Sequence, residues 1–240
     1  FRTIPLYFVI FIGFLGYSLS ITILTPLILN DSGGVLASLP IEADSLIVLG
    51  IVLALYPLGQ FFGSPVLGSL SDRFGRKPVL MTSLVISTIG YLGFAYALYM
   101  KNLPMFMTVS LFIGLSESNI VIAQSAIADV STRENRTRLF AYINLSASGA
   151  FVIGPLIGGL LADSNIVPWF SYDTPFWAVC ALLFTTTVLT FFIFKETRPE
   201  GARVNVSYLK AFTNLSTVFT SKNLRLIYLI NFLIYFSIFG

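Results

Sequence analysis

Residues 68–80 read Gly-Ser-Leu-Ser-Asp-Arg-Phe-Gly-Arg-Lys-Pro-Val-Leu, a short polar run between two long apolar stretches. One acid and three cations crowd this turn. Gly68 and Gly75 permit close backbone approach and a sharp chain reversal, and Pro78 suits the first turn of a following helix. A buried helix pair in a water-soluble protein has no need for so many charges in one tight turn. The run therefore predicts two membrane-spanning helices joined at the membrane surface.

The composition supports a membrane protein. The chain of 240 residues is 56% hydrophobic and 10% charged, with a mean hydropathy of +0.87. Soluble globular domains carry about 25% charged residues. A water-soluble protein of this length could not cover its surface with so few charges.

Several site chemistries are excluded by residue types that are missing or rare. Histidine is absent, and Cys180 is the single cysteine. This removes imidazole as metal ligand or catalytic base, and it removes a disulfide framework or a cysteine-based metal site. A Gly-rich phosphate loop ending in Gly-Lys-Ser or Gly-Lys-Thr is also absent. We therefore expect no enzyme activity, no metal, no cofactor and no nucleic-acid partner.

The apolar segments have the length of membrane spans, since a helix crosses about 30 Å of hydrocarbon with about 20 residues. They predict an all-α membrane protein with helices at about 4–29, 45–70, 78–100, 103–128, 139–162 and 174–194. Residues 1–194 should form a six-helix N-terminal bundle and 195–222 a cytoplasmic linker. Residues 223–240 should begin a seventh helix that is still apolar at the last residue, so we expect further helices to follow.

The basic residues of the loops predict the orientation, because cytoplasmic loops are enriched in Lys and Arg. With the N-terminus inside, all of the 14 Lys and Arg except Lys101 fall on the inner side. The outer loops hold acids instead. We expect a multi-pass protein of the cell (inner) membrane, embedded in the lipid bilayer, with a cytoplasmic N-terminus.

Four motifs carry a family resemblance. The pattern Gly-x-Leu-x-Asp-Arg-x-Gly-Arg-Lys at 68–77 resembles the signature loop between helices two and three of the major facilitator superfamily. Gly-Pro-Leu-Ile-Gly-Gly at 154–159 resembles a motif of the superfamily's drug–proton antiporters. Weaker matches are Ala-Asp-Val at 128–130, after helix four, and Glu-Thr at 196–197, after helix six.

The resemblance implies the N-terminal half of a twelve-helix transporter whose cytoplasmic loops act as a gate. Arg76 should pair with Asp129, and Asp72 should face a helix of the second half. Breaking these contacts would let the cytoplasmic side open. The implied gating residues are Gly68, Asp72, Arg73, Gly75, Arg76, Lys77 and Asp129.

The glycines of the fifth predicted helix form a smooth face. Gly154 and Gly158 are four residues apart, so another helix can approach closely. Pro155 frees a backbone carbonyl and bends the helix. Together with Gly159 these residues predict a pivot between two rocking halves, and ordinary helix packing is an equal alternative.

Glu117 is the only Asp, Glu, Lys or Arg in the core of the complete helices. A charged carboxylate in mid-membrane is costly, so it is either protonated or faces a polar cavity. Ser110 and Gln124, each seven residues away, should share its helix face. We expect this face to bind a proton or a cationic group of the substrate; the alternative is a neutral, hydrogen-bonded structural glutamate.

Other polar side chains at membrane depth are candidates for a cavity lining. They include Tyr17, Gln60 and Asn144. The resemblance places helices one, two, four and five along the transport route. The alternative for any one of them is a hydrogen bond within the helix packing.

The leading functional prediction is a monomeric secondary transporter that exports a small organic molecule by proton antiport. An Arg usual on helix four is replaced by Ser110, and an acid usual on helix one is replaced by Tyr17. These departures favour the alternative, a proton-coupled or facilitated importer of a metabolite or siderophore-like compound. A membrane receptor or scaffold without transport is a more distant alternative.

Overall fold

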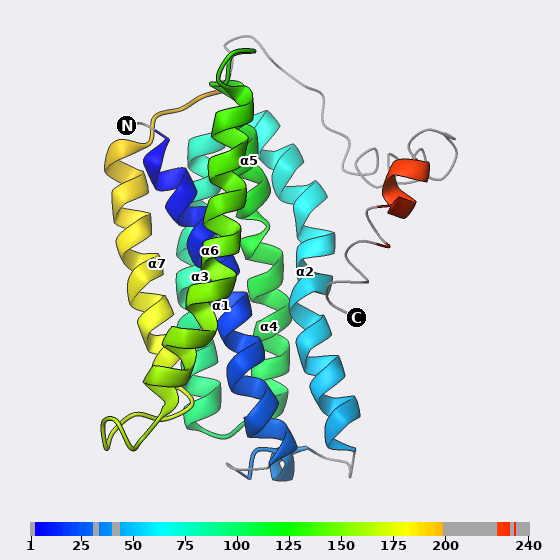
Figure 1. The fold of residues 1–240 in the computed structure, drawn as a ribbon, viewed down its shortest axis with the longest axis vertical. Coiled ribbons are helices and arrows are strands. Elements are labelled where there is room, and N and C mark those ends of the chain that lie inside the picture. Colours follow the sequence, from blue (N-terminus) through cyan, green and yellow to red (C-terminus); the bar gives the residue numbers. More distant parts are fainter. Residues whose placement is uncertain (1–2, 31–33, 40–43, 199–224, 231–232, 234–240) are drawn as a thin grey trace.

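The computed structural model describes residues 3–30, 34–39, 44–198, 225–230 and 233. In Figure 1 the long helices stand side by side with nearly parallel axes. Their bounds are α1 Ile4–Leu29, α2 Ser45–Phe74, α3 Arg76–Tyr99, α4 Leu103–Glu117, α5 Asn119–Asp129, α6 Arg136–Ala162 and α7 Thr174–Ile193, with a short 3-10 helix at Leu36–Ser38.

Six spans in the described part of the chain are long and apolar enough to cross a membrane. They confirm the six predicted helices, with ends displaced by a few residues. Five of the spans are single helices, whereas the span Leu103–Asp129 combines α4 and α5. Residues 225–230 are helical, in keeping with a further helix. The predicted linker beyond Arg198 and most of the predicted seventh helix lie outside the described residues.

One predicted helix is interrupted. The segment expected to run unbroken over 103–128 divides at Ser118, between α4 and α5. The Ser118 hydroxyl donates to the carbonyl oxygen of Gly114, at 3.2 Å, and to that of Gln60 on α2, at 3.1 Å. Serine that bonds back to a carbonyl one turn earlier is known to bend helices. The break therefore has a local cause, and it lies directly after Glu117.

α1 is the centre of the bundle and packs against α2, α5, α6 and α7. In an apolar 18-residue stretch of α1, 61% of the residues are buried, whereas the shares are 28% in α2 and 17% in α6. Near one end of the bundle, Phe94 of α3 stacks on Phe106 of α4 at 4.3 Å between ring centroids, and Phe176 of α7 meets both rings edge-on. α2 and α6 thus keep broad apolar faces available to lipid or to further protein.

The turns after α2 and α5 and the end of α7 meet at one end of the bundle, the upper end in Figure 1. This is the end at which the motif residues of the loops gather. The positive φ of Gly75, 108°, makes the reversal between α2 and α3. Side chains with a Cβ rarely adopt that conformation, so the predicted role of Gly75 in a sharp turn is confirmed.

Candidate functional site

A buried carboxyl group lies at the junction of α2, α3 and α4. Glu117, the last residue of α4, is 1% exposed. Its Oε2 accepts a hydrogen bond from the Tyr56 hydroxyl of α2, and the Tyr91 hydroxyl of α3 lies 3.4 Å from the same oxygen. Oε1 has no hydrogen-bond partner among the described residues. This oxygen is free to carry a proton or to accept a bond from a group that enters the site.

Glycines allow α2 and α4 to pack closely at this site. A Cβ on Gly114 of α4 would collide with the carbonyl oxygen of Tyr56, and one on Gly59 of α2 would collide with that of Leu111. Helices approach this closely only where side chains are missing. Gly114 lies about one helical turn before Glu117, so this contact brings Tyr56 within reach of the Glu117 carboxyl group.

A large cavity lies next to this carboxyl group. Its volume is about 1330 Å³, and its walls come from α1, α2, α5 and α6. The polar lining residues are uncharged, and aromatic side chains make up part of the apolar wall. The residues that matter most for its chemistry are Tyr17, Tyr56, Gln60, Gln124, Asn144, Ser148, Phe14 and Phe151.

Each of the polar residues expected to line a cavity lies on the wall of this one. These are Tyr17, Gln60 and Asn144, and Gln124 lies there as well. Their roles in transport stay predictions.

The expected shared face of Ser110, Glu117 and Gln124 is divided between two helices. Ser110 and Glu117 keep their seven-residue spacing within α4 and are both buried, and the Ser110 hydroxyl donates to the Phe106 carbonyl at 2.9 Å. The break at Ser118 separates them from Gln124 of α5, which lines the cavity. The partners of Glu117 are tyrosines that the sequence analysis missed.

Tyr56 and Tyr91 gave little signal in the sequence, because both lie in apolar runs where tyrosine commonly packs or anchors a helix. The four-residue spacing of Tyr56 and Gln60 was the one available hint, since such residues share a helix face. In the structure Gln60 Nε2 donates to the Tyr56 hydroxyl at 3.1 Å. The Tyr17 ring stacks on Tyr56 with 5.0 Å between centroids.

Arg76, at the turn between α2 and α3, forms one ion pair with α5 and one with the end of α2. The Arg76 guanidinium bonds Asp129 at 3.0 Å and Asp72 at 2.7 Å, and it also donates to the Ser71 hydroxyl at 2.6 Å. The pair between Arg76 and Asp129 was predicted and is confirmed. Asp72 is half-exposed and binds Arg76; a contact of Asp72 with a second half stays a prediction.

Glu196, just beyond α7, caps the start of α3. Its carboxylate accepts the backbone N–H groups of Arg76 at 2.9 Å and Lys77 at 3.0 Å, and also those of Thr197 and Arg198. The first amides of a helix have no partner within the helix, so the carboxylate satisfies two of them. Partial burial acts to raise the pKa of Glu196, but the four N–H donors outweigh it and hold this pKa below its ordinary value.

The same segment also holds the end of α2. Arg198 donates from Nη1 to the carbonyl oxygens of Asp72 and Arg73. Lys77 donates from Nζ to the carbonyl oxygen of Phe191, at 2.8 Å. We call these contacts, together with the Glu196 cap and the pair of Arg76 with Asp129, the loop latch.

Gly68 departs from its expected role, whereas Gly154 and Gly158 make the close helix approach that their spacing predicts. A Cβ on Gly68 would meet only Val121, at 4.0 Å, so the expected close backbone approach at Gly68 is absent from the part of the chain described here. On α6, a Cβ on Gly154 would collide with Ser18, and one on Gly158 would lie 3.2 Å from Leu19, both on α1. The smooth face thus packs inside this bundle, and the pivot of Gly154, Pro155, Gly158 and Gly159 stays a prediction.

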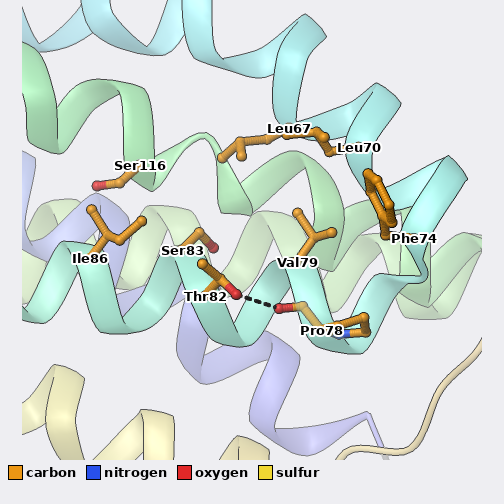
Figure 2. A pocket seen from close by; sticks show the side chains of 9 residues that line it. All are labelled: Leu67, Leu70, Phe74, Pro78, Val79, Thr82, Ser83, Ile86 and Ser116. Atoms are coloured by element: carbon orange, nitrogen blue, oxygen red, sulfur yellow. Dashed lines mark hydrogen bonds between the residues drawn. The ribbon is translucent and has the colours of Figure 1, made fainter.

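Figure 2 shows a second hollow, between α2 and α3 and next to Phe74 and Pro78 near the turn that joins these helices. Its volume is about 510 Å³, and its walls are mostly apolar, from Leu67, Leu70 and Phe74 on one side to Val79 and Ile86 on the other. Its one drawn hydrogen bond, from Thr82 to the Pro78 carbonyl at 3.0 Å, is internal to α3. The large cavity, with its polar wall, is therefore the better candidate for a substrate site.

Comparison with known proteins agrees with the loop and helix motifs. The family model of the Major Facilitator Superfamily matches residues 6–240. The class H tetracycline resistance protein of Pasteurella multocida is 32% identical over 177 residues, 73% of this chain and 42% of that protein. The class B protein of Escherichia coli is 34% identical over 151 residues, 62% of this chain and 35% of its own length.

Solved structures agree on the fold. The human organic anion transporter MFSD10 superposes with a TM-score of 0.64 at 23% identity, over 88% of this chain and 53% of that one. A D-xylose–proton symporter superposes with a TM-score of 0.67 at 17% identity, over 90% of this chain and 53% of that one. The chain thus spans about half of these structures and less than half of the two curated relatives. With a family model that matches nearly its whole length, the chain belongs to the major facilitator superfamily of membrane transporters.

Proposed function

We propose that this chain is the N-terminal half of a transporter that exports a small organic molecule in exchange for protons. The observation that carries the proposal is Glu117, a buried carboxyl group one tyrosine hydroxyl away from a cavity of about 1330 Å³. An uncharged wall of aromatic and amide side chains suits an organic molecule with apolar rings and hydrogen-bonding groups. Two of the relatives are named as tetracycline resistance proteins, in keeping with export.

The coupling follows from the cost of charge at membrane depth. Loss of the Glu117 proton leaves a carboxylate that has tyrosine hydroxyls but no cation against it among the described residues. Such a charge is disfavoured in a dry site and favoured where water or a substrate reaches it. A bundle that offers these two surroundings in its two conformations therefore binds a proton in one and releases it in the other.

The loop latch serves as the gate in this proposal. It joins the α2–α3 turn to α5 through Arg76 and Asp129, and to the end of α7 through Glu196. Breaking it would free α5, which borders the cavity, from Arg76 of α3, and would free the end of α2 from Arg198. We place the latch and the N-terminus on the cytoplasmic side of the inner membrane, in a protein that acts as a monomer with a linker at 195–222 between its halves.

Proton-coupled uptake is the second candidate. It is favoured by Tyr17 and Ser110, which stand where antiporters of this type carry an acid and an arginine. The fold is shared with a structure titled as a D-xylose–proton symporter. Export predicts that protons and substrate cross in opposite directions, whereas uptake predicts the same direction.

The test uses inside-out membrane vesicles that contain the full-length transporter, with tetracycline and ethidium as fluorescent probes. Acidifying the vesicle lumen should drive accumulation of at least one probe, and accumulation should alkalinise the lumen. The Glu117→Gln variant should lose the gradient-driven part while still binding the probe. The matched control Glu134→Gln removes an exposed acid of the α5–α6 turn and should behave as wild type. No probe movement in wild-type vesicles, or co-movement of probe and protons, would contradict proton-driven export.

A further inference from the structure

Glu117 has a defined route to the cavity in this structure. The carboxyl group is 1% exposed, whereas Tyr56 and Gln60 are part of the cavity wall. The Tyr56 hydroxyl donates to Glu117 Oε2 and accepts from Gln60 Nε2 at 3.1 Å. One phenol oxygen therefore stands between the buried carboxyl group and the cavity.

The surroundings of this hydroxyl keep it in place. The Tyr17 ring of α1 stacks on the Tyr56 ring, with 5.0 Å between centroids and 17° between planes. The backbone of Tyr56 is fixed against Gly114, where a Cβ would collide with its carbonyl oxygen. A side chain packed in this way holds its hydroxyl oxygen in one position without blocking rotation of the hydroxyl hydrogen about the C–O bond.

The other tyrosine at the carboxyl group lies on the far side from the cavity. Tyr91 is fully buried, and its hydroxyl is 3.4 Å from Oε2. It is absent from the residues that line the cavity within the described chain. Tyr56 from α2 and Tyr91 from α3 are the titratable groups that face Glu117 in the described residues, and Tyr17 from α1 faces Tyr56.

We propose that the Tyr56 hydroxyl relays protons between the cavity and Glu117, an inference that rests on the proposed proton coupling. When Glu117 takes up a proton, the Tyr56 oxygen accepts a proton from a hydronium ion in the cavity while the hydroxyl proton of Tyr56 passes to the Glu117 carboxylate. One O–H bond breaks and one forms at Tyr56, Glu117 becomes a neutral acid, and the hydronium ion becomes water. Release runs the same steps in reverse, and no net charge stays on Tyr56.

Gln60 is a positioning residue in this scheme. Its amide donates to the Tyr56 oxygen and so directs the phenol O–H toward Glu117. Because Gln60 lines the cavity, its displacement by water or by a substrate would leave the phenol oxygen open to a proton donor. Substrate in the cavity could thereby control how fast Glu117 exchanges its proton.

The relay is tested by the rate at which the Glu117 carboxyl group exchanges hydrogen for deuterium. The full-length transporter in lipid is moved from H2O to D2O, and the carboxylic acid C=O band, assigned by its loss in Glu117→Gln, is followed by infrared spectroscopy. Tyr56→Phe keeps the ring and removes the hydroxyl, and should slow the exchange at least tenfold. Tyr91→Phe and Tyr17→Phe are matched controls and should exchange within about twofold of wild type.

Gln60→Met removes the amide that occupies the Tyr56 oxygen and is the second variant should Tyr56→Phe fail to fold. It should speed the exchange several-fold, and an unchanged rate would count against the relay. Wild-type exchange in Tyr56→Phe, or equal slowing in Tyr91→Phe, would overturn the relay. These results would leave the coupling itself intact as long as Glu117→Gln still abolishes gradient-driven transport. Absence of any band that depends on Glu117 between pH 5 and pH 9 would overturn the relay and the proposed proton site together.

Discussion

Replacing Glu196 by alanine should loosen the loop latch and open the bundle on that side of the membrane. The carboxylate caps α3 through the amides of Arg76 and Lys77, at 2.9 and 3.0 Å, and orders the start of the following segment through Thr197 and Arg198. A capping acceptor contributes about 1 kcal/mol, and a negative charge at a helix N-terminus about 0.3–1 kcal/mol. Loss of both, about 1.3–2 kcal/mol, should shift the closed-to-open ratio by about 10–30-fold.

The measurement is the labelling rate of a cysteine in the cavity. Asn144→Cys, in a Cys180→Ser background, places a thiol on the cavity wall. A membrane-impermeant maleimide is added from the side on which Glu196 lies. Labelling should be about 10–30-fold faster in Glu196→Ala than in the parent.

Lys195→Ala is the matched control, since it changes an exposed neighbour that is not part of the latch. It should label at the parental rate. An unchanged rate in Glu196→Ala, or an equal increase in Lys195→Ala, would refute the reasoning that Glu196 holds the closed state.

The remaining predictions concern the latch, the helix contact and pH. Asp129→Asn removes the ion pair with Arg76 and should also speed labelling of the cavity cysteine, by about 2–5-fold for a pair at a partly exposed site; an unaltered rate would mean that this pair has no share in gating. Gly114→Ala forces α2 away from α4 and should lower the free energy of unfolding by about 1–3 kcal/mol, measured by thermal unfolding in detergent. Gly159→Ala is the control, because Gly159 has open space around it, and it should leave the free energy of unfolding unchanged. The pKa of Glu196 is depressed, so its stabilising effect is present above the ordinary pKa of 4.5 and is lost as pH falls through the lowered pKa of the folded protein. The stability of the closed state on that side should therefore be constant from pH 5 to 8. A loss of this stability near pH 6–7 would point to another group.

The spans could be predicted because their signal is summed over whole segments. About 20 apolar residues cross a bilayer whatever their detailed order, so six helices were found with ends displaced by only a few residues. The pair of Arg76 and Asp129 was also accessible, since both belong to recognisable motifs at the same end of the bundle.

The chemistry of the site was less accessible, because it depends on how helices cross. Nothing in the apolar run around Tyr56 distinguishes a tyrosine that bonds Glu117 from one that faces lipid. Their contact requires the glycine crossing of α2 and α4, and the glycines that make it, Gly59 and Gly114, belong to none of the motifs. The expected face shared with Gln124 assumed a continuous helix, and the break at Ser118 separates Gln124 from the helix of Ser110 and Glu117.

The loop contacts show a similar limit. The match at Glu196 indicated that this acid matters, but its partners are backbone N–H groups, which sequence motifs do not show. The role of Gly75 was predictable because a tight turn needs a positive φ, which glycine alone adopts readily. Gly68 was assigned a similar role, but its surroundings in the described residues are open.

The central claim, that Glu117 exchanges the proton that drives transport, is tested most directly by counting protons. Full-length transporter in inside-out vesicles is given a probe that it moves, and the protons that cross per probe molecule are measured with a pH-sensitive dye. Wild type should move at least one proton against each probe molecule, and Glu117→Gln should exchange probe across the membrane with no linked proton. Undiminished proton movement in Glu117→Gln would contradict the account.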